Sequence, residues 1–180
     1  METRKVARIG MLMALAMILS YVESLFPAFV AIPGVRIGLA NLAVIFALYT
    51  LGFKEAFAIS ILRVVLSSLL FGTVLSLAYS AAGAVLSIIV MALLKRTRLF
   101  GVPAVSVCGA VSHNLGQIGV ACLILNAKGL LYYIPVLMIS GVISGLIIGL
   151  TASVLVNRIG IRQEDIEDGR QREEDRRSAK

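Results

Sequence analysis

The amino-acid sequence predicts an all-α membrane protein, built as a bundle of six transmembrane helices. Hydrophobic residues make up 59% of the 180 residues and the mean hydropathy is +0.95, whereas a soluble domain is usually about 45–50% apolar. Charged residues gather at the two ends of the chain, and only five occur between Ile9 and Leu94. Between these ends, apolar stretches long enough to form helices recur along the sequence.

Six apolar segments are the expected helices, because about 20 residues are needed to cross a hydrocarbon layer of about 30 Å. We place them near residues 8–26, 37–52, 56–72, 76–94, 103–125 and 132–157. The first follows a basic start, as a signal peptide does, but it is long enough to span and no A-x-A cleavage site follows it. We therefore expect an uncleaved first helix. The second segment is short for a span, and the turn-rich "FPAFVAIPG" before it is expected to fold back at the membrane surface.

Small residues recur at every fourth position in the fourth and sixth segments. They are Ser76, Ser80 and Ala84 in the fourth segment, and Gly141, Gly145 and Gly149 in the sixth. Such repeats let another helix backbone approach closely. Packing within this bundle and docking to a second membrane protein are both open at this point.

The distribution of basic residues predicts that both termini are cytoplasmic, because cytoplasmic loops carry an excess of Lys and Arg. In that orientation the cytoplasmic side holds Arg4, Lys5, Arg8, Lys54, Lys95, Arg96, Arg98, Arg158 and Arg162, and the outside holds Arg36 and Lys128. We expect a multi-pass protein of the bacterial cell membrane with one membrane domain over residues 1–160. Residues 161–180 are a charged cytoplasmic tail, expected to be either helical or disordered.

Several other classes of site are not indicated. The net charge of +7 does not predict nucleic-acid binding, because the basic residues flank apolar segments and form no aromatic-interleaved patch. Cys108 and Cys122 fall in one apolar segment, which is neither a disulfide framework nor a CxxC site. Cys108 and His113 diverge on a helix without a third ligand, and Ser112 does not share a face with His113. We therefore expect no metal, no cofactor and no catalytic Ser–His pair.

Polar residues inside the apolar segments are the candidate site. His113, Asn114 and Gln117 share one arc of the fifth helix, and an unpaired polar group in hydrocarbon costs several kcal/mol. Arg63 lies far from both ends of the third helix, and an intramembrane charge by default indicates function. In the expected orientation, Arg63 and His113 lie roughly 12 and 15 Å deep at 1.5 Å per residue.

Three more residues, Glu23, Arg36 and Asn41, lie toward the outer side. We expect the seven polar residues to line one cavity that opens to the outside. Arg63 would pair with an anionic group through its bidentate fork. The ligand would be oriented by His113, Asn114, Gln117 and Asn41, and the mouth shaped by Glu23 and Arg36. The alternative is that interhelical hydrogen bonds, and an ion pair from Glu23 to Arg63 or Arg36, only hold the bundle together.

Three stretches of the sequence resemble the Gx transporter family, also called heptaprenyl diphosphate synthase component I. They are "IGLANLAVIFALYTLGFKEAFAISILRVVLSSLLFG", "SAAGAVLSIIVMALLKR" and "GAVSHNLGQIGVACLIL", of which "HNLGQ" is the most specific piece. The resemblance runs from about Ile37 to Leu125. This family is distantly similar to the S components of energy-coupling-factor transporters. That similarity implies six helices, cytoplasmic termini, a small-molecule substrate, and an energising module or another subunit as partner.

The two family names imply different activities. Prenyl diphosphate synthases hold magnesium with DDxxD motifs, and this chain has none, so the resemblance does not imply catalysis by this chain alone. No Walker A motif occurs, and instead of the AxxxA stripe of S components the first helix has only the pair Gly10 and Ala14. We therefore expect a transport protein that binds a small anionic or amphipathic substrate. The alternatives are a non-catalytic subunit for heptaprenyl diphosphate or quinone synthesis, or a membrane part of a flavin- or quinone-linked electron-transfer system.

Overall fold

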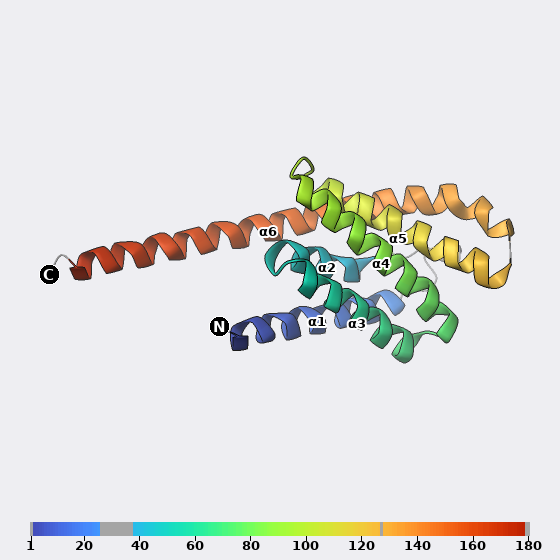
Figure 1. Cartoon of the computed structure of the whole chain (residues 1–180), viewed down its shortest axis with the longest axis horizontal. Coiled ribbons are helices and arrows are strands. Elements are labelled where there is room, and N and C mark those ends of the chain that lie inside the picture. Colours follow the sequence, from blue (N-terminus) through green and yellow to red (C-terminus); the bar gives the residue numbers. More distant parts are fainter. Residues whose placement is uncertain (1, 26–37, 127, 179–180) are drawn as a thin grey trace.

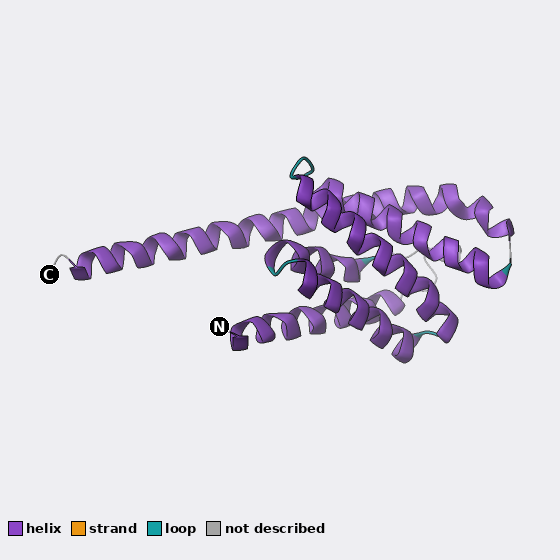
Figure 2. Cartoon of the chain, in the orientation of Figure 1, coloured by secondary structure: helices purple, strands orange, loops and turns teal. Residues whose placement is uncertain are grey.

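The computed structural model of the chain is a bundle of α-helices (Figures 1 and 2). It describes residues 2–25, 38–126 and 128–178, with the backbone alone for 2, 4, 128 and 159–178. The elements are α1 (Glu2–Ser24), α2 (Leu39–Thr50), α3 (Phe53–Phe71), α4 (Val74–Thr97), α5 (Val102–Leu125), the short 3₁₀ helix η1 (Lys128–Tyr133) and α6 (Ile134–Ser178). No strand occurs within these ranges. The prediction of an all-α fold with six helices is confirmed, while the segment "FPAFVAIPG" lies outside the described residues.

The helices pack as a ring in the order α1, α3, α4, α5, α6, α2, with α2 also against α3. The core of this ring is apolar and tightly packed around α2, where Val44, Ile45 and Leu48 are fully buried. Met91 of α4 and Val105 of α5 complete the same cluster. Helices α4, α5 and α6 lie side by side along the length of the bundle (Figure 1).

Helices α1 and α3 run parallel and in register. Near their starts the side chains of Lys5 and Glu55 form an ion pair. Near their ends the rings of Tyr21 and Phe71 lie 5.4 Å apart between centroids. The two contacts are separated by the same stretch of helix on each side, about 24 Å at 1.5 Å per residue. They therefore tie the two helices together at both ends.

Helix α2 is short and central. It is bounded by Gly38 and Gly52, both of which have positive φ (74° and 112°), a backbone region in which other residues are strained. Its length is about 18 Å at 1.5 Å per residue, well below the roughly 30 Å of a hydrocarbon core. Because almost all of its side chains are packed against neighbouring helices, α2 serves as the centre of the bundle.

The outer surface of the bundle is apolar. Within the described residues, four stretches are long and apolar enough to cross a membrane: Lys5–Ser24, Val74–Thr97, Val102–Leu125 and Gly129–Arg158. Helix α3 is not one of these stretches because it carries three charged residues, Lys54, Glu55 and Arg63. On α6, large apolar side chains face outward at helical spacing, namely Ile139, Val142, Ile143, Leu146, Ile147 and Leu150. A surface of this kind suits lipid, since soluble monomers rarely expose a contiguous apolar area of this extent.

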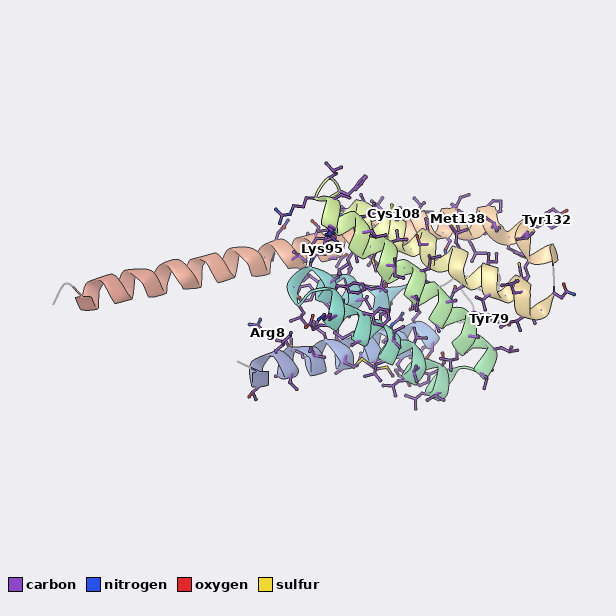
Figure 3. The ribbon with its side chains drawn as sticks, viewed as in Figure 1. Arg8, Tyr79, Lys95, Cys108, Tyr132 and Met138 are labelled. Atoms are coloured by element: carbon purple, nitrogen blue, oxygen red, sulfur yellow. The ribbon has the colours of Figure 1, made fainter. Side chains whose placement is uncertain are left out.

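The two ends of the bundle differ in character. Arg8 and Lys95 lie at the end where the N-terminus is, and Tyr79 and Tyr132 lie at the opposite end (Figure 3). Helix α6 continues as one helix to Ser178, so the charged tail is helical and projects beyond the bundle (Figure 1). Both termini point to the basic end, and the assignment of this end to the cytoplasm stays a prediction from the charge distribution.

Candidate functional site

Helix α5 carries three of the seven polar candidate residues, and glycines bring its backbone close to that of α4. A Cβ atom added to Gly83 of α4 would lie 2.7 Å from the carbonyl oxygen of His113. A Cβ added to Gly116 of α5 would lie 2.9 Å from Cα of Gly83. Real Cβ atoms do not come this close, so only glycine fits at either position. The two helices therefore cross with backbone against backbone at the level of His113.

The glycine repeat of α6 faces the other side of α5. A Cβ on Gly145 would lie 2.8 Å from Cα of Val107, and one on Gly149 would lie 2.6 Å from Cα of Pro103. These atoms belong to the backbone and cannot rotate away. The repeat is thus used for packing within the bundle, which was one of the two possibilities left open by the sequence.

The polar side chains of α5 are divided between these two seams. His113 and Gln117 lie against Gly83 of α4, since a Cβ there would be 2.9 Å from Cγ of Gln117. Asn114 turns the other way, and its Nδ2 donates a hydrogen bond of 2.7 Å to the carbonyl oxygen of Leu137 in α6. Successive residues on an α-helix are rotated by roughly 100° about its axis. His113 can therefore face α4 while the next residue, Asn114, faces α6. The predicted stripe therefore serves two contacts.

Arg63 lies near the middle of α3, with its side chain half-buried and its Nε atom buried. Helices α3 and α4 are antiparallel around the turn at Gly72 and Thr73. The stretch from Arg63 to Phe71 equals that from Val74 to Ala82, about 12 Å at 1.5 Å per residue. Arg63 is therefore at the same level along the bundle as Ala82 and Gly83.

Gly83 contacts His113 on the opposite side of α4. Helix α4 packs against both α3 and α5, and α3 and α5 have far less contact with each other. Arg63, Gly83 and His113 thus occupy one level in three adjacent helices. Arg63 and His113 therefore lie on two helices that pack on either side of α4. The residue count puts them at a similar level along the bundle.

Glu23 links α1 to the start of α2. Its Oε1 accepts a hydrogen bond of 2.6 Å from the backbone N–H of Gly38. A carboxylate is favourable at this place, because the first N–H groups of a helix lack intrahelical partners and carry partial positive charge. Asn41 is half-buried in the first turn of α2, where its backbone N–H donates to the carbonyl oxygen of Gly38 at 2.8 Å. Arg36 lies outside the described residues.

Three buried hydroxyls are additional to the predicted site residues, and the first of them is Ser20 of α1. Ser87 of α4 is 2% exposed and Ser106 of α5 is 1% exposed, and neither Oγ has a hydrogen-bond partner in the described part of the chain. The signal that points to Ser87 is its spacing of two helical turns from Ser80, which is also buried. Among the described residues, no three His, Cys, Asp or Glu side chains gather closely enough to hold a metal ion.

Together, the apolar outer surface, the four long apolar helices and the polar groups confined to interhelical seams define a multi-pass membrane protein. Within that class, the chain belongs to the heptaprenyl diphosphate synthase component I family, whose sequence model matches residues 12–155. Neither a curated protein nor a solved structure matches the chain. The resemblance to S components stays a prediction.

Proposed function

We propose that this chain is a membrane-embedded binding component, which takes a small anionic or amphipathic molecule and takes part in its transport. Arg63 is the observation that carries the proposal. A guanidinium near the middle of an otherwise apolar helix is costly and characteristically marks a pathway or ligand site. Its Nε is buried, and the side chain as a whole is half-buried.

Arginine specifies the class of ligand. Its planar fork matches carboxylate and phosphate groups bidentately, and it keeps its charge in an apolar environment. His113 and Gln117, at a similar depth, are the proposed orienting groups on the α4 side of α5. The family description names heptaprenyl diphosphate, a molecule that joins such an anionic group to an apolar chain. A ligand of that type would suit a charged group surrounded by apolar helices.

Two of the proposed ligand-binding residues also hold helices together. Asn114 and Glu23 have structural partners in Leu137 and Gly38, so their removal would disturb helix packing as well as any ligand. Substitution of Arg63 removes the charge that carries the proposal, and it is therefore the direct test. Arg36 and Asn41 remain proposed contributors at the outer end.

The test compares Arg63→Gln with Lys54→Gln, which removes the same charge from the exposed start of the same helix. Purified protein in detergent is titrated calorimetrically with farnesyl diphosphate, farnesol, thiamine and flavin mononucleotide. We expect a phosphorylated probe to bind the wild type and the Lys54 variant equally, and the Arg63 variant at least about tenfold more weakly. Thermal unfolding shows whether each variant is folded. Equal binding by a folded Arg63 variant would contradict the proposed site.

A second candidate function is that of a membrane subunit of a heptaprenyl diphosphate synthase. The family description favours it, because a component I implies at least one further component. The catalytic metal site would then lie on a partner with a DDxxD motif. Co-purification with such a synthase, and loss of its activity when this chain is deleted, would support this function over transport. An unchanged synthase activity in the deletion strain would count against it.

A further inference from the structure

The turn between α4 and α5 combines exposed basic and exposed apolar side chains. Arg96 and Arg98 are both exposed, and they are followed by Leu99 and Phe100, which are 82% and 46% exposed. Arg98 has a left-handed backbone (φ 56°) and ends α4, so the chain reverses within a few residues. The turn projects from the basic end of the bundle (Figure 1).

The length of α4 sets the depth of this turn in a bilayer. The uncharged stretch from Val74 to Leu94 is about 31 Å long at 1.5 Å per residue, which matches a hydrocarbon core of about 30 Å. The residues after Leu94 therefore fall at the level of the lipid headgroups. At that level, arginine side chains meet phosphates, and an adjacent leucine and phenylalanine can reach the acyl chains.

The neighbouring charged groups leave both arginines available to a lipid. Lys95 is held inside the bundle, where its Nζ donates to the carbonyl oxygen of Leu48 at 2.6 Å and lies 5.0 Å from the ring centroid of Tyr49. Glu55 is the acidic side chain described at this end, and it is paired with Lys5 on α1. The turn thus presents net positive charge beside apolar surface.

We propose that this turn, Arg96–Phe100, binds an anionic phospholipid of the adjacent leaflet. Arg96 and Arg98 contact the headgroup phosphate, and Leu99 and Phe100 insert beside the first acyl segments. Each basic residue close to an anionic membrane surface favours association by about fivefold. A soluble protein partner would also meet basic and apolar groups here, but the span length places the turn at headgroup depth.

The chain contains no tryptophan, which allows a clean test. Full-length Phe100→Trp protein is reconstituted into mixed vesicles of phosphatidylcholine and phosphatidylglycerol, with brominated acyl chains on one lipid or the other. We expect brominated lipid to quench the tryptophan strongly and aqueous iodide to quench it weakly. At equal mole fraction, bromine on phosphatidylglycerol should quench more than bromine on phosphatidylcholine.

Adding Arg96→Gln and Arg98→Gln to the reporter should abolish the preference for phosphatidylglycerol. The matched control adds Arg8→Gln and Arg158→Gln, which removes the same charge from α1 and α6 at the same end and should preserve the preference. Equal quenching by the two lipids would overturn the headgroup site. Strong quenching by iodide would overturn insertion and favour a protein partner. Neither outcome bears on Arg63, so this proposal fails separately from the proposed function.

Discussion

The side-chain amide of Asn114, in the middle of α5, donates a 2.7 Å hydrogen bond to the carbonyl oxygen of Leu137, in the first turn of α6. Gly141 makes room for this contact, since a Cβ there would lie 2.9 Å from Asn114 Nδ2. A polar group that would be costly in lipid is thereby used to join two helices. Asn114 therefore has a structural role between α5 and α6, whatever its part in ligand binding.

Substitution Asn114→Leu should lower the free energy of unfolding by about 0.6–2 kcal/mol, the range measured for hydrogen bonds between membrane helices. Gln117→Leu is the matched control, because that amide lies on the α4 side and donates no bond to α6. Unfolding is followed by circular dichroism in detergent. Equal losses in both variants would show that the bond to Leu137 adds no stability.

Substitution Gly145→Ala should destabilise the protein by about 1–3 kcal/mol, as overpacking of a well-packed core does. The added methyl group would meet backbone atoms of α5, 2.8 Å away, and neither helix can yield locally. Gly119→Ala is the control on the exposed side of α5, where a Cβ meets nothing within 4 Å. We expect its melting temperature to be unchanged or slightly raised, because alanine favours helix over glycine. A Gly145 variant as stable as wild type would argue against the close α5–α6 contact.

Lys95→Met should cost about 1–3 kcal/mol of stability. The substitution removes the charged hydrogen bond to Leu48 O and the contact with the Tyr49 ring, while it keeps a similar side-chain length. Arg96→Met changes a neighbouring exposed cation and should have little effect on unfolding. Chemical denaturation of the two variants in one detergent compares them directly. If both behave alike, the contact between α4 and the end of α2 contributes no net stability.

The pKa of Glu55 is held below its ordinary value of 4.5, first by the hydrogen bond from Lys5 and then by a backbone hydrogen bond. A depressed folded pKa gives stability that is fully present above pH 4.5. It is lost as the pH falls through the lower folded value. Lys5→Gln should raise the pKa of Glu55 and make unfolding less dependent on pH in this acid range.

The effect of Lys5→Gln on stability should be small, because the Lys5 side chain is exposed to solvent. Lys54→Gln is the comparison. Lys54 affects the pKa of Glu55 only through its charge, and its contribution to the lowered pKa is the smallest. The carboxyl resonance of Glu55, followed by NMR, reports the pKa of each variant. An unchanged Glu55 pKa in the Lys5 variant would contradict the ion pair between α1 and α3.

Much of the fold follows from local sequence properties. The apolar stretches predicted all six helices and ten of their twelve ends to within three residues, because hydrophobic run length and helical period are local. The start of α1 differs, since its helix begins at Glu2 and includes the basic residues before the apolar run. The second helix agrees with its prediction as a segment short for a span, and Gly38 and Gly52 flank it at its two ends. The tail beyond Arg158 continues α6, a choice that composition leaves open.

By itself, the sequence determined that this chain forms apolar helices, because the length and periodicity of the apolar runs are local properties. It also determined which of these helices carry polar residues. Only the tertiary structure decided what those residues contact. Asn114 bonds to α6 while His113 packs on α4 because Gly83 and Gly145 let the backbones of two different helices approach α5 from either side. That arrangement depends on matched small residues far apart in the chain. No local pattern specifies which of them will meet.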